Sequence, residues 1–116
     1  MIRPAADTDV FLYSEPVDMR KSINGLATLV EQEMALSPFD RKLFVFCNRG
    51  RDKVKLLYWE RNGFVLWYKR LEKFRFQWHW DSMPSHIDGD LLNRLLDGYD
   101  IRPPQPHPAL TYTSMI

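Results

Sequence analysis

Lysine, arginine and aromatic side chains are concentrated in one third of this chain, where they could bind a polyanion that carries planar bases. Residues 41–75 hold eleven of the sixteen Lys and Arg residues but only three of the fifteen Asp and Glu residues, so this stretch has a formal charge of +8 and the remainder −7. Residues 44–80 also carry eleven of the sixteen aromatic residues. Clustered positive charge with interleaved ring surface is typical of proteins that contact nucleic-acid phosphates and bases.

The candidate contacts lie in a turn and in the hairpin that follows it. In a hairpin around Asn62-Gly63, a two-residue loop would place Lys55 opposite Arg70, whereas a four-residue loop would place Lys55 opposite Tyr68 and Lys53 opposite Arg70. Like charges across a strand pair cost up to about 1 kcal/mol unless an anion or a carboxylate lies between them. The alternative is a solvated sheet face that keeps the domain soluble. The candidate nucleic-acid-binding residues are Arg49, Arg51, Lys53, Lys55, Tyr68 and Arg70, with Trp59 as a ring that could stack on unpaired bases.

A second candidate site is the segment Asp18-Met19-Arg20-Lys21, at the expected start of a helix. Cations in a first helical turn oppose the helix dipole, but a bound anion would gain from them and from the free backbone N–H groups. Arg20 and Lys21 are therefore candidate secondary phosphate contacts. The simpler alternative is that they point into water or pair with Glu15.

No pattern in the sequence indicates catalysis. The acids are scattered, the three His residues lack metal-ligand spacing, and Cys47 lies in an apolar run typical of an inert core thiol. We therefore expect a non-enzyme with no catalytic residue, no metal site and no cofactor. A metal-dependent nuclease is the weakest hypothesis, because its carboxylates would have to converge from distant positions such as Asp52 and Glu60.

The pattern of apolar residues predicts one domain, residues 1–102, followed by a Pro-rich tail, residues 103–116. Its expected class is α+β: an antiparallel, meander-like sheet of four to five strands with two helices packed on one face and the basic hairpin side accessible. The expected strands are residues 10–13, 43–47, 54–59, 64–71 and 74–80, with 43–47 central. The row Phe74, Phe76, Trp78 and Trp80 favours a buried strand face, with a base-stacking platform as the alternative.

Two helices are predicted. The first has Asp18 as N-cap and ends near residue 36; the second has Asp88 as N-cap, a stripe of Leu91, Leu92, Leu95 and Leu96, and a stop at Gly98. A single cysteine excludes internal disulfides, and neither a signal peptide nor a run of eighteen apolar residues is visible. We therefore expect a cytoplasmic protein without membrane contact.

These residues resemble a known family, the second open reading frame product of insertion-sequence family sixty-six, often called TnpB, which is unrelated to the RNA-guided nuclease of that name. The resemblance runs in order from residue 1 to about residue 102. Residues 88–90 depart mildly from it, because relatives tend to have Ser or Thr followed by Pro there. The matching motifs are Asp18-Met19-Arg20-Lys21, Arg49-Gly50-Arg51-Asp52-Lys53, Leu57-Tyr58-Trp59, Tyr68-Lys69-Arg70 and Leu95-Leu96-Asp97-Gly98.

The resemblance implies a bacterial mobile-element protein that assists transposition next to a separate, longer transposase. The leading hypothesis is a non-catalytic accessory factor that binds DNA, at the element ends, through the basic hairpin. The alternative is a protein adaptor that binds the transposase, with the hairpin meeting an acidic partner.

Overall fold

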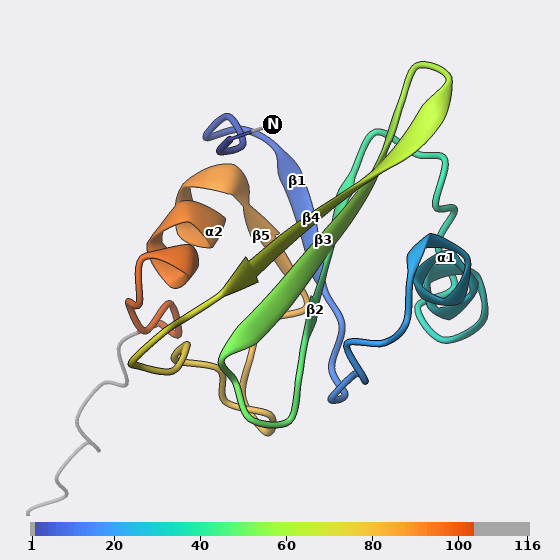
Figure 1. The fold of residues 1–116 in the computed structure, drawn as a ribbon. Helices are drawn as coiled ribbons and strands as arrows, with labels where there is room; N and C mark the ends of the chain where they lie inside the picture. The colour runs from blue at the N-terminus through green and yellow to red at the C-terminus, as the bar shows by residue number, and fades with distance from the viewer. Residues whose placement is uncertain (1, 104–116) are drawn as a thin grey trace, which may run out of the picture.

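The computed structural model describes residues 2–103, which form a five-stranded sheet and two helices (Figure 1). The strand order is β4-β3-β2-β1-β5. The elements are β1 (Asp9–Leu12), α1 (Ile23–Gln32), β2 (Leu43–Cys47), β3 (Lys53–Glu60), β4 (Gly63–Arg70), β5 (His86–Asp88) and α2 (Gly89–Leu96). The α+β class and the largely antiparallel sheet are confirmed.

The sheet departs from a meander at β1. Strands β2, β3 and β4 pair antiparallel in sequence order, but β1 pairs parallel with β2. Parallel neighbours need a long crossover connection, and the segment that contains α1 supplies it. Strand β5 then adds antiparallel to the free side of β1, so β4 and β5 are the edges.

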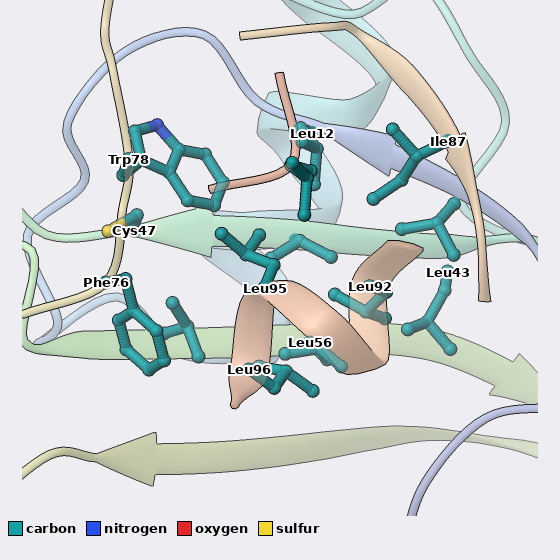
Figure 2. Close-up of a cluster of buried hydrophobic side chains, with 14 residues drawn as sticks. Leu12, Leu43, Cys47, Leu56, Phe76, Trp78, Ile87, Leu92, Leu95 and Leu96 are labelled. Atoms are coloured by element: carbon teal, nitrogen blue, oxygen red, sulfur yellow. The ribbon is translucent and has the colours of Figure 1, made fainter. Parts of the chain in front are cut away.

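The two helices lie on opposite faces of the sheet, so the expectation that both pack on one face was wrong. One buried cluster joins α1, through Leu26 and Val30, to Phe44, Phe46 and Leu57. The other joins α2 to the opposite face, with the α2 leucines pointing at the strands (Figure 2). Alternating side chains of one strand point to opposite faces, and β2 has apolar residues at every position, so it needs a cover on both sides.

Strand β2 is the central strand, as predicted. All five of its residues are buried, and it is the third of the five strands in the sheet order. Both hairpin strands are also confirmed: β3 is one residue longer at each end than the expected 54–59, and β4 begins and ends one residue earlier than the expected 64–71.

The strand predicted at residues 74–80 is wrong: this segment is irregular and joins no strand. Phe76 and Trp78 are buried in the α2 cluster, as an inward-facing row would be, but Phe74 is 79% exposed. The backbone N–H of Phe76 donates to the carbonyl of Arg51, and that of Trp78 donates to the carbonyl of Phe76 itself. These local and loop bonds replace a strand ladder, so the segment covers the core without extending the sheet.

Helix α2 follows the prediction, whereas α1 begins later than expected and ends at Gln32, earlier than the predicted end near residue 36. The Asp88 carboxylate accepts from the Leu91 N–H at 2.9 Å, and Gly98 ends the segment with φ of +101°. The N-cap of α1 is Ser22 and not Asp18, whose carboxylate instead accepts the N–H of Arg20 in a turn before the helix. Of the predicted tail, only Pro103 is described; residues 104–116 lie outside the described part of the chain.

Candidate nucleic-acid interface

The hairpin register places basic side chains opposite one another. Lys53 pairs with Arg70 and Lys55 with Tyr68, which is the second of the two registers that the sequence allowed. The turn, however, consists of Arg61 and Asn62, with Arg61 in the left-handed region at φ of 54° and Gly63 already in β4. Figure 1 shows this turn projecting beyond the neighbouring strands.

Carboxylates accompany both members of the like-charged pair. The Nζ of Lys53 lies 3.2 Å from Oδ2 of Asp52, and Nη2 of Arg70 lies 3.0 Å from Oε1 of Glu72. These acids offset the repulsion that the register would otherwise impose.

The turn that carries Arg49 is built by Asn48, a residue that the sequence analysis missed. Its Oδ1 accepts the N–H groups of Asp52 and Lys53, at 3.1 and 3.0 Å, and its Nδ2 donates to Asp52 Oδ1 at 2.7 Å. The Asn48 bond is the main reason why the pKa of the Asp52 carboxyl is lowered, and Lys53 adds to the effect. An Asn ahead of Arg-Gly-Arg is the signal that could have revealed this turn, because Asn side chains readily bond nearby backbone groups. The turn therefore holds Arg49 on the surface.

Lys55 is buried, so it is not the exposed contact that the sequence suggested. Its side chain is 7% exposed, and its Nζ donates to the carbonyls of Met19 and Lys21 at 2.7 and 2.8 Å. The ammonium group also lies 5.1 Å from the ring centroid of Tyr68. Lys55 therefore fixes the segment before α1 against the hairpin.

That link brings two segments distant in sequence to one concavity, which we call the hairpin concavity. Its volume is about 700 Å³. It is lined by Pro16, Val17, Asp18, Met19, Arg20, Asn48, Arg49, Gly50, Lys53 and Tyr68. Three of the candidate cations and the half-exposed Tyr68 ring thus face one space.

The cations of the hairpin concavity differ in their partners. Nη2 of Arg20 lies 2.6 Å from Oδ2 of Asp18, and this hydrogen bond is the main reason why the pKa of Asp18 falls to about 2. Lys53 pairs with Asp52, whereas Arg49 is exposed and has no ion pair within residues 2–103. Exposed ion pairs contribute little to stability, so a phosphate can replace the Asp18 carboxylate as the partner of Arg20 at low cost.

The other candidate residues lie elsewhere. Lys21 and Arg70 are exposed next to the lining, and Arg51 is half-buried with φ of 60°. Trp59 lies six residues along β3 from Lys53, about 20 Å away at roughly 3.3 Å per residue. It contacts Phe39 and Phe64 and not the hairpin concavity.

Among the described residues, no group of three or more His, Cys, Asp or Glu side chains comes together as a metal site. Burial is the main reason why the pKa of the Cys47 thiol is raised, to about 12. No helix within residues 2–103 is long and apolar enough to cross a membrane.

Comparison with known proteins identifies the family. A family model described as IS66 Orf2 like protein matches residues 8–106. Two uncharacterized proteins of Sinorhizobium fredii are similar: y4hO is 32% identical over 111 residues, which cover 90% of this chain and 92% of y4hO. The second, y4jC, is 33% identical over 76 residues, which cover 66% of this chain and 65% of y4jC. No solved structure matches. The chain therefore belongs to the IS66 Orf2-like family, whose members are accessory proteins of insertion-sequence transposition and are not known as catalysts.

Proposed function

We propose that this protein assists transposition by binding DNA through the hairpin concavity, at the ends of its element. The observation that carries the proposal is the meeting of two basic segments in one space: Arg20 comes from the segment before α1, and Arg49 and Lys53 come from the turn and the start of β3. Arginine and lysine side chains that converge from separate segments are suited to contact successive phosphates of one strand.

The charges around the concavity support this proposal. Arg49 has no ion pair in the described part of the chain, and the Arg20 pair with Asp18 is exposed to solvent. A DNA phosphate would therefore bind the guanidinium of Arg49 directly and would compete with Asp18 for the guanidinium of Arg20. Tyr68, 49% exposed, offers a ring next to these cations.

The structure also revises which residues a test should change. Replacing Lys55 would remove the link between two segments, so loss of binding in that variant would not identify a contact. We therefore choose Arg49→Ala with Lys53→Ala, and Arg94→Ala as the matched control. Arg94 is exposed on α2, at the opposite face of the sheet, and contacts the ring of Tyr99.

The experiment measures fluorescence anisotropy with an element-end duplex, a scrambled duplex and a single strand. We expect the double variant to lose most of its affinity for DNA and Arg94→Ala to retain it. Equal affinity of the double variant and the wild type would refute the hairpin concavity as the DNA site. Tighter binding to the element end than to the scrambled duplex would show sequence recognition.

A second candidate function is an adaptor for the transposase of the same element. The observation in its favour is that Arg20, Lys53 and Arg70 already have carboxylate partners, so the surface is less positive than the sequence suggests. A pull-down with the transposase in nuclease-treated extract separates the two functions. Capture that survives the nuclease, together with no affinity for DNA at low salt, would favour the adaptor.

A further inference from the structure

Three aromatic rings form a second surface feature at the far end of the hairpin, which we call the tip cluster: Phe39, Trp59 and Phe64. The ring centroid of Trp59 lies 5.1 Å from that of Phe39 and 5.0 Å from that of Phe64, and both pairs meet edge to face at 76°. Phe39 and Phe64 are 5.3 Å apart. Although it contacts two rings, Phe39 remains 54% exposed, so much of its ring faces solvent.

The loop that carries Phe39 is held in place by local bonds. The Phe39 N–H donates to the Ser37 hydroxyl at 3.3 Å, and the Asp40 N–H donates to the Ser37 carbonyl at 3.2 Å. Lys42 lies 3.7 Å from the Asp40 carboxylate. The exposed ring is therefore held in position before any ligand arrives, which reduces the entropy cost of binding.

Two arginines stand beside these rings. A concavity of about 520 Å³ is lined by Phe39, Arg41, Trp59, Glu60 and Arg61. Arg41 and Arg61 are both exposed, and neither has an ion pair within the described chain. Positive charge next to an open ring disfavours a cationic ligand and favours an aromatic group that carries an anion.

We propose that the tip cluster binds an unpaired nucleotide, with its base on the exposed ring of Phe39 and its phosphate at Arg41 or Arg61. Every base has a face that can stack on an aromatic side chain, so such a site needs no particular sequence. This inference rests on the proposed function, because the hairpin concavity, about 20 Å away along β3, would hold the adjoining duplex. The protein would thereby prefer DNA in which paired and unpaired strands meet.

The test compares three DNAs: a blunt duplex, the same duplex with a single-stranded overhang, and that overhang without its bases. The abasic strand keeps the phosphates, so it separates stacking from charge. We expect the intact overhang to improve affinity about tenfold, equivalent to about 1.4 kcal/mol, and the abasic overhang to lose most of that gain. Equal affinity for the intact and abasic overhangs, of either polarity, would overturn the proposal.

Protein variants assign the effect to the tip cluster. Phe39→Ala should remove the preference for the overhang and leave binding to the blunt duplex unchanged. Phe74→Ala is the matched control, because Phe74 is even more exposed but lies in the irregular segment after β4. Arg41→Ala with Arg61→Asn should weaken binding to both overhangs; Asn tolerates the left-handed backbone of residue 61. An unchanged preference in Phe39→Ala with a native melting curve would refute the site.

Failure of this inference and failure of the proposed function give different results. If the wild type does not bind the blunt duplex but still binds the overhang DNA, only the hairpin concavity is refuted. If Phe39→Ala instead weakens capture of the transposase and leaves the overhang preference unchanged, the tip cluster is a protein interface and the nucleotide proposal is overturned.

Discussion

Replacing the buried Lys55 by Met, which has a similar length but no charge, should destabilise the protein strongly. Two hydrogen bonds from the ammonium group to the carbonyls of Met19 and Lys21 would be lost, at 2.7 and 2.8 Å in the native protein. Hydrogen bonds from charged donors contribute about 1.5–3 kcal/mol each, and the carbonyls would be left without a donor. Because Met retains part of the packing, we expect a loss of about 3 kcal/mol in the free energy of unfolding. For a domain of this size, that corresponds to a melting temperature roughly 12–24 °C lower.

Urea unfolding followed by tryptophan fluorescence measures this loss, and an unchanged m-value would show that the change is one of stability. Lys53→Met is the control. Lys53 is two residues away on the same face, one third exposed and paired with Asp52, so its replacement should cost less than about 1 kcal/mol. Equal stability of Lys55→Met and the wild type would refute the conclusion that Lys55 joins the hairpin to the segment before α1.

Two further predictions concern Gly89 and Cys47. A Cβ on Gly89 would lie 1.8 Å from the carbonyl oxygen of Ala5. Gly89→Ala should therefore lower the free energy of unfolding by about 1–3 kcal/mol or release the N-terminal segment to proteolysis. Gly63→Ala should be close to neutral, because a Cβ at Gly63 would have open space around it. Because burial raises the pKa of Cys47 from 9.0 to about 12, the unfolded chain loses its thiol proton first, and stability should fall as the pH rises above about 9. At pH 10.5 the loss should be about 2 kcal/mol greater in the wild type than in Cys47→Ala, as measured by urea unfolding; identical pH profiles would contradict this.

The elements with strong local signals were predictable from the sequence. An unbroken apolar run marked β2, and Asp88, the leucine stripe and Gly98 marked both ends of α2. Strand β5, with only three residues directly before that N-cap, has no periodicity that a sequence pattern could show. The alternation of residues 74–80 correctly indicated the burial of Phe76 and Trp78 but not a strand, because the backbone N–H groups of these two residues bond to the carbonyls of Arg51 and Phe76.

The candidate site was only partly predictable, because tertiary contacts decide it. Alternation correctly placed Lys53 and Lys55 on one face, but the segment before α1 covers part of that face, so Lys53 is one third exposed whereas Lys55 is buried. Nothing in the sequence indicated that Arg20 would line the same concavity as Arg49, since the two segments are joined by the bonds from Lys55 to the carbonyls of Met19 and Lys21. Trp59 was predicted on the correct face and yet belongs to a separate aromatic cluster, because six strand residues separate it from Lys53.

The most direct test of the central claim is the salt dependence of duplex binding by the wild type, by Arg49→Ala with Lys53→Ala, and by Arg94→Ala. Each phosphate contact releases counterions, so the slope of log affinity against log salt should become shallower by about 0.9 for each contact removed. We predict a slope shallower by roughly 2 in the double variant and an unchanged slope in Arg94→Ala. Identical slopes in all three proteins would contradict a DNA interface at the hairpin concavity.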